Sequence, residues 1–321
     1  INKMRLPAEL SERHWLAAAE HPGVYWRQGV SAGTWLAQQP TDELRADTRA
    51  NRLRYMLQDT MGSPRAFELR RSELKQLGWA EGGDCGDDDV LASYEQSLQP
   101  GGLMREYLRH AQLAVLVGPC LFVHGAVGAD SLGVVPGPAA GGGPPAGRLR
   151  LREWVDGLNE FASRQVAEWC EDVDSAEGPS WAGASTRGGA GIFERPGGEL
   201  MAYGMARRAD GSASPTVVYA SFLRDGQPVA AAPRVVDYVV AGGARVLVTG
   251  HQPHGDAPAI MRCRGAGGRP SEDRATDESA ADGGAAEGVN ELLVVTADTS
   301  FSNDVEWLET AASPPSPPPA M

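Results

Sequence analysis

Residues 113–124 read LAVLVGPCLFVH, and this stretch decides the fold class that we expect for the chain. Two short apolar runs are divided by Gly118-Pro119, a pair that favours a turn. Because the apolar residues are continuous rather than alternating, they predict two strands that are buried on both faces. A histidine and a glycine, His124-Gly125, follow the second run directly. The stretch therefore predicts a buried sheet with a polar residue at the end of a strand.

Helical patterns precede this stretch, and strands and helices alternate after it. The expected helices cover residues 7–19, 42–60 with Thr41 as N-cap, Pro64 to Gly78, 103–110 and 234–240. A further helix begins at residue 151, where six apolar residues recur at helical spacing and predict core packing: Leu151, Trp154, Val155, Leu158, Phe161 and Trp169. Further strands are expected at 199–204, 216–223, 244–249, 259–263 and 291–297. This order indicates an α/β (α+β) fold.

Glycine and proline are unusually frequent, with 40 and 23 of the 321 residues. We expect much of this excess in flexible insertions near 129–150 and 264–290 and in a Pro-rich disordered tail at 311–321. The acidic run EGGDCGDDD at 81–89 lacks the ligand order of a calcium loop and predicts a solvated loop. The remainder of residues 1–310 is interpreted as one domain.

The charge balance excludes some classes of partner. The chain has 29 Lys and Arg against 42 Asp and Glu, a net charge of −13, which argues against binding to nucleic acid or anionic lipid by bulk charge. No apolar run reaches the roughly 18 residues of a membrane helix, so no membrane segment is expected. The four cysteines are widely spaced and favour a reducing, intracellular compartment over a disulfide framework or a zinc knuckle: Cys85, Cys120, Cys170 and Cys263.

Three of the six histidines stand at or just after apolar strands. They are His124 in FVHG and both His251 and His254 in TGHQPHG. A strand end holds an imidazole rigidly, and an adjacent glycine lets a ligand approach closely. We interpret His124 and His251 as ligands of one divalent cation, with Asp298, which follows the last strand, as a candidate carboxylate. Asp256 is a second candidate, for which a role in a turn is favoured.

A competing interpretation takes LFVHG as the oxyanion loop of an α/β-hydrolase. Such an enzyme needs a Gly-x-Ser-x-Gly elbow after a strand. The nearest stretches, GPSWA at 178–182 and GASTR at 183–187, both lack the closing glycine. A phosphate-binding Walker motif is also absent from the sequence. These absences leave the metal interpretation as the stronger one.

Three stretches taken in order resemble the second half of the calcineurin-like metallophosphoesterases, a superfamily that includes the phosphoprotein phosphatases. They are FVHGAV at 122–127, VTGHQPHGDAP at 248–258 and VVTADTSFS at 294–302. INKMRL at 1–6 resembles the residues that follow the third metal motif of some members. The resemblance implies that residues 1–310 are the C-terminal portion of the domain, N-terminally truncated after its first three metal motifs. The implied fold is a sandwich of two facing mixed β-sheets flanked by helices.

The resemblance also implies a function and roles for single residues. His124 and His251 match metal ligands, and Asp298 matches a residue that supports the site without touching the ion. His254 stands one residue later than the second histidine of the Gly-His-x-His found in many members, so we interpret it as a contact to the substrate phosphate or a support of a ligand. Two divalent ions (Mn, Fe or Zn) belong to the whole centre, of which at most one is expected here. The implied activity is metal-dependent hydrolysis of a phosphorylated protein or small molecule, weak or absent in this piece. The alternative is a non-catalytic binding protein that retains the scaffold.

Overall fold

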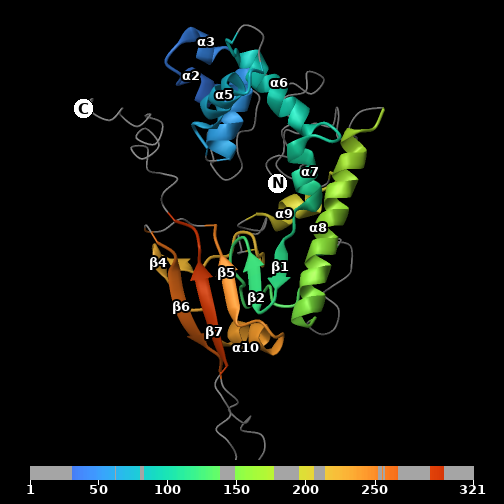
Figure 1. Ribbon diagram of the computed structural model, residues 1–321, viewed down its shortest axis with the longest axis vertical. Helices are drawn as coiled ribbons and strands as arrows, with labels where there is room; N and C mark the ends of the chain where they lie inside the picture. Colours follow the sequence, from blue (N-terminus) through green and yellow to red (C-terminus); the bar gives the residue numbers. More distant parts are fainter. Residues whose placement is uncertain are drawn as a thin grey trace, which may run out of the picture. The chain divides into compact units, whose positions relative to one another are not determined.

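A computed structural model describes residues 31–61, 63–79, 83–137, 149–176, 195–205, 214–251, 255, 257–266 and 290–299. The chain divides into two compact units (Figure 1). The first comprises Ile1–Ala111 with Ala162–Ala202, and the second comprises Gln112–Phe161 with Tyr203–Met321. The expected helix at 7–19, the tail at 311–321 and most of the two expected insertions lie outside the described residues.

The described part of the first unit is helical. Before residue 112 its elements are α2 (Ala32–Ala37), α3 (Asp42–Arg45), α4 (Arg49–Tyr55), the π-helical turn η2 (Met56–Thr60), α5 (Ala66–Gln76), α6 (Asp87–Leu98) and α7 (Leu103–His110). The unit also includes the second half of α8 (Leu151–Val173) and nearly all of α9 (Gly198–Tyr203). The single helix expected at 42–60 is therefore broken. Thr41 caps α3 as predicted, but the hydroxyl of Thr48 also accepts a hydrogen bond from the backbone N–H of Asn51 and starts α4. A second N-cap within the stretch separates the two helices.

The acidic run at 81–89 was expected to be a loop, but its last three residues lie in a helix. Asp87, Asp88 and Asp89 form the first turn of α6, and the backbone N–H of Gly86 donates a 2.8 Å hydrogen bond to Asp89 Oδ2. Negative charge at a helix N-terminus is stabilised by the helix dipole, which explains why the run starts a helix. Asp87 also forms an ion pair of 2.7 Å with Arg54.

The described part of the second unit contains a five-stranded mixed sheet in the order β1-β2-β5-β7-β6, together with the short pair β3 (Leu223–Arg224) and β4 (Gln227–Pro228). The five strands are β1 (Ala114–Val117), β2 (Cys120–Val123), β5 (Val246–Thr249), β6 (Ala259–Arg264) and β7 (Glu291–Thr296) (Figure 1). The three central strands β2, β5 and β7 are parallel, and the edge strands β1 and β6 run antiparallel to their neighbours. The fold is thus mixed α/β, as the sequence predicts.

One face of this sheet is buried and the other is partly exposed. Leu121, Leu247 and Val294 share the buried face with residues of two helices, α8 (Leu151–Val173) and α10 (Pro233–Ala241). On the opposite face, Phe122 and Val117 are 40% and 60% exposed. The expectation that both strands of the 113–124 stretch are buried on both faces was therefore wrong for the described structure.

The apolar stripe of α8 is confirmed as core, since all six of its predicted residues are buried. The indole Nε1–H of Trp154 donates a 2.9 Å hydrogen bond to the Val134 carbonyl oxygen. On the same helix, Asn159 Oδ1 accepts hydrogen bonds from the backbone N–H groups of Leu113 and Ala114, and its Nδ2 donates to the Ala114 carbonyl oxygen. Asn159 thereby takes the place of a neighbouring strand at the start of β1.

Two expected strands were wrong. Residues 199–204 lie mostly in a helix, α9 (Gly198–Tyr203), because Gln165 Oε1 accepts hydrogen bonds from the N–H groups of Glu199 and Leu200 at the helix start. Residues 216–222 lie before β3 and contain a turn at 217–219. Their backbone groups pair outside a ladder, since the Val217 carbonyl accepts from Gly125 and the Val217 N–H donates to the Tyr203 hydroxyl.

Candidate functional site

Three residues singled out from the sequence lie at one edge of the five-stranded sheet. His124 directly follows β2, Gly250 and His251 follow β5, and Asp298 follows β7 by two positions. Because these strands are parallel neighbours, their carboxyl ends meet at the same edge, the usual position of ligand sites in such sheets. The structure therefore brings together His124, His251 and Asp298, and we call this group the strand-end site.

The two imidazole rings face each other closely. Their centroids are 5.2 Å apart and their planes meet at 63°. With metal–nitrogen bonds of about 2.1 Å, two imidazoles on one tetrahedral ion have centroids about 5.3 Å apart. His124 is exposed and His251 is half-buried, so the pair is reachable from solvent. The spacing of the rings thus fits two nitrogen ligands of a single ion.

The backbone of His251 has an uncommon conformation, with φ at 78°. Residues other than glycine rarely adopt positive φ, and the conformation costs on the order of 1 kcal/mol. The chain turns at this residue, the second after β5, and the imidazole lies beside that of His124. Strained residues of this kind cluster at functional sites.

The environment of His251 lowers the pKa of its imidazole below the ordinary value, mainly because burial disfavours the charged form. The neighbouring His124 acts in the same direction, and the negative charge of Asp298 acts against both. The neutral imidazole is the form that binds a metal ion.

Asp298 lies against Gly250, the residue that precedes His251. A Cβ placed on Gly250 would be 3.6 Å from Asp298 Oδ2 and 3.5 Å from the carbonyl oxygen of His124. Asp298 is partly buried and influences His251 through its charge. This position suits a residue that supports the site electrostatically, as the sequence resemblance implies.

Tyr219 is a member of the site that sequence reasoning missed. Its ring centroid is 4.6 Å from that of His251, with the planes at 71°. The residue lies in the segment that was expected to be a strand, where a tyrosine has the ordinary role of an exposed strand residue. The segment that carries it is joined to Gly125, next to His124, by a hydrogen bond from Gly125 to Val217, and no local sequence pattern predicts this contact.

Other predicted members cannot be placed in the site. His254 and Asp256 lie outside the described residues. Within the part of the chain that the structure describes, no group of three or more His, Cys, Asp or Glu residues could hold a metal ion. The described donors for a cation are therefore the two imidazoles.

In the same part of the chain, no helix is both long and apolar enough to cross a membrane.

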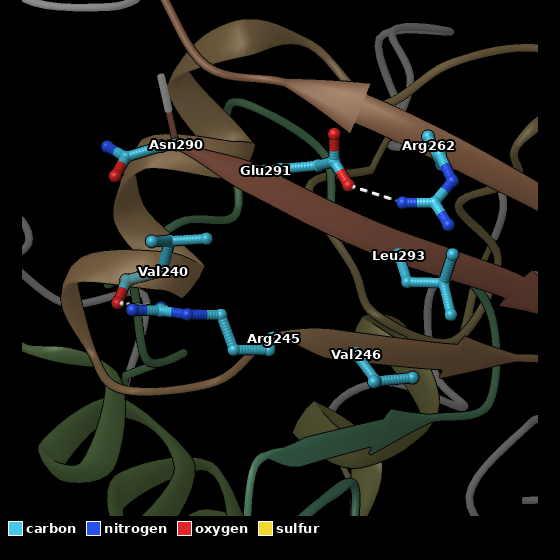
Figure 2. Close-up of a pocket in the computed structure, with 7 residues that line it drawn as sticks. All are labelled: Val240, Arg245, Val246, Arg262, Asn290, Glu291 and Leu293. Carbon is cyan, nitrogen blue, oxygen red and sulfur yellow. Dashed lines mark hydrogen bonds and ion pairs between the residues drawn. The ribbon is translucent and has the colours of Figure 1, made fainter. Parts of the chain in front are cut away.

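A pocket of about 580 Å³ lies at the amino ends of β5 and β7, opposite to the strand-end site (Figure 2). Its charged residues have structural partners. Figure 2 shows Arg262 paired with Glu291, at 2.7 Å, and the guanidinium of Arg245 directed at the carbonyl oxygen of Val240, at 2.9 Å. Arg245 thus satisfies the C-terminal end of α10, and none of the predicted site residues lines this pocket.

Comparisons with protein-family models, with curated proteins and with solved structures found no match to this chain.

Proposed function

We propose that the strand-end site binds one divalent metal ion through His124 and His251, and that the chain is a metal-dependent phosphoester hydrolase of the calcineurin-like type. The observation that carries the proposal is the 5.2 Å separation of the two imidazole rings, which come from adjacent parallel strands. Mn, Fe and Zn are the metals that suit such a centre, and a phosphorylated protein or small molecule is the substrate class.

The chemistry follows from the donors. A divalent ion bound there would act as a Lewis acid, which would polarise phosphoryl oxygens and activate water. His124 and His251 would hold the ion, and the turn at His251, with its positive φ, would orient its ring towards it. The negative charge of Asp298 offsets positive charge at the site and favours cation binding. His254 remains the expected contact to the phosphate.

The exposed face of the sheet supports the finer proposal of a two-sheet sandwich. One residue from each strand forms an apolar row across this face: Val115, Phe122, Val248, Val295 and Ile260. Phe122 and Ile260 are 40% and 66% exposed. An apolar sheet face of this kind is typical of a surface that packs on a second layer. The part of the chain that the structure describes contributes one five-stranded sheet and the short β3–β4 pair.

The proposal is tested by calorimetric titration of Mn²⁺ into the protein. His124→Ala and His251→Asn, where asparagine tolerates the positive φ, should each weaken Mn²⁺ binding by at least about tenfold. His110→Ala is the matched control, because His110 lies on α7 with an 83% exposed side chain, and it should bind as the unaltered protein does. Unchanged Mn²⁺ affinity in His251→Asn would contradict the ligand assignment.

A non-catalytic binding protein is the second candidate. The sequence features that favour it are the insertion near 264–290 and the Pro-rich stretch at 311–321, which would serve as contact segments for a partner. Hydrolysis of p-nitrophenyl phosphate with added Mn²⁺ separates the two candidates. Turnover, even weak, that is lost in His251→Asn supports the hydrolase. Mn²⁺ binding with no turnover above background, both in this chain and in any longer protein that contains it, supports the binding protein.

A further inference from the structure

The strand-end site has an aromatic wall formed by Tyr219. The tyrosine ring lies against the imidazole of His251 with a centroid separation of 4.6 Å, and 41% of the residue remains exposed. An exposed aromatic ring beside a pair of imidazoles leaves apolar surface where a ligand would approach His124 and His251. Such surface commonly contacts planar groups of ligands.

The segment that carries Tyr219 is fixed rather than free to swing away. Thr216 and Val217 are buried, and the Val217 carbonyl oxygen accepts a 2.7 Å hydrogen bond from the N–H of Gly125, next to His124. Gly125 allows this approach, since a Cβ there would lie 2.5 Å from the carbonyl oxygens of Val218 and Ala220. The backbone on either side of Tyr219 therefore packs directly on the residue that follows His124.

A second set of contacts fixes the far end of the segment. The backbone N–H of Leu223 donates to Ser221 Oγ, and the N–H of Val229 donates a 2.7 Å hydrogen bond to the Phe222 carbonyl oxygen. Phe222 is buried in the core of the second unit. With both ends held, Tyr219 is preorganised at the rim of the site, which reduces the entropy cost of using it to bind a ligand.

We propose that Tyr219 contacts the leaving group of the substrate and gives the strand-end site a preference for phosphoesters of planar, aromatic alcohols over those of aliphatic alcohols. This inference rests on the proposed function, because it assigns a substrate class to the same site. The aromatic contact accounts for a preference of about three- to tenfold.

The test compares the binding of phenylphosphonate and methylphosphonate, two non-hydrolysable probes, by calorimetry in the presence of Mn²⁺. The unaltered protein should bind phenylphosphonate about three- to tenfold more tightly than methylphosphonate. Tyr219→Phe should keep this ratio, and Tyr219→Leu should reduce it towards one. Tyr107→Leu, at a 65% exposed tyrosine on α7, is the matched control and should change neither affinity.

The outcomes separate the inference from the proposed function. If the ratio of the two phosphonate affinities is unchanged in Tyr219→Leu, and the thermal unfolding midpoint is also unchanged, the role of Tyr219 is overturned. The proposed function still stands in that case, provided that methylphosphonate binding requires Mn²⁺ and His251. If neither phosphonate binds in a Mn²⁺-dependent way, the proposed function is overturned, and the inference with it. Loss of the ratio in both Tyr219→Leu and Tyr219→Phe also contradicts the inference, because phenylalanine retains the aromatic face.

Discussion

The backbone N–H of Gly250 donates a hydrogen bond of 2.9 Å to the carbonyl oxygen of His124. This bond continues the pairing of β2 with β5 beyond the last ladder residues, so the two chains are still joined where they leave the sheet. His251 follows at once with its positive φ. The bond therefore fixes the two histidines relative to each other through their backbones, and the side chains need no partner of their own to stay close.

The two glycines beside the histidines should respond differently to substitution. Gly125→Ala would place a Cβ 2.5 Å from two backbone carbonyl oxygens, and we expect it to destabilise the protein by about 1–3 kcal/mol. Gly250→Ala would place its Cβ 3.5 Å from the nearest atom, and we expect a change within about 0.5 kcal/mol. Urea unfolding of both variants measures the difference. Equal stabilities would show that the segment carrying Tyr219 does not pack on Gly125.

The pKa of His251 should lie below its ordinary value of about 6.5. A histidine whose pKa is lower in the folded than in the unfolded state makes no difference to stability at high pH. It destabilises the folded state progressively as the pH falls from the unfolded pKa to the folded one. NMR titration of the imidazole signals measures the pKa directly. A value at or above 6.5 would contradict the burial of this ring.

The neighbours of His251 give this titration its internal controls. His124→Gln should raise the pKa of His251, because it removes a positive charge that opposes protonation. Asp298→Asn should lower the pKa further, because it removes the negative charge that favours protonation. Shifts in the reverse directions would mean that the three side chains are not grouped as the structure places them.

Asp87→Asn should destabilise the protein by about 0.5–1 kcal/mol at neutral pH. The hydrogen bond from Arg54, assisted by the charges of Arg54 and Arg71, lowers the pKa of the Asp87 carboxyl, although burial opposes this shift. A carboxyl with a lowered pKa stabilises the folded state above its unfolded pKa, and this contribution is lost as the pH falls through the folded pKa. The variant should therefore lose less stability than the unaltered protein on acidification below about pH 4.

Asp88→Asn is the matched control for this measurement. Asp88 is exposed and lies in the same first turn of α6, so both variants remove a negative charge that interacts favourably with the helix dipole. Only Asp87→Asn removes the ion pairs with Arg54 and Arg71. If the stability of both variants changes with pH in the same way, the loss of stability on acidification comes from the helix dipole and not from the ion pairs of Asp87.

Asn159→Leu should cost about 1–3 kcal/mol, because three backbone hydrogen bonds at the start of β1 lose their partner. Glu160→Ala changes the neighbouring, exposed position of α8 and should stay within about 0.5 kcal/mol. Hydrogen exchange of the Leu113 and Ala114 amides is the more direct measurement. Protection that survives in Asn159→Leu would contradict the role of this side chain.

Local patterns predict the elements that carry the histidines. The apolar runs before His124 and His251 become β2 and β5, and the stripe that begins at Leu151 becomes the buried face of α8. These elements are predictable because burial and residue spacing along the chain coincide. The placement of His124 beside His251 follows from the parallel pairing of their strands, which the sequence alone does not specify.

The elements that were not predicted depend on partners distant in sequence. Gln165 provides the hydrogen bonds that start α9, and Gly125 fixes the segment of Tyr219. Both segments have apolar and β-branched or aromatic residues that favour strands, and tertiary contacts overrode this tendency. The break after α3 is of another kind, since Thr48 signals it locally but competes with the helical pattern on both sides.

The hydrogen bonds of Asn159 have a consequence for how molecules of this protein behave in concentrated solution. The first residues of an edge strand expose N–H and C=O groups to which a strand of another molecule can add. At Leu113 and Ala114 a side chain of the same molecule already occupies these groups. A helix thus closes that end of the sheet to intermolecular pairing, and the Asn159→Leu protein should aggregate at lower concentrations than the unaltered one even where it remains folded.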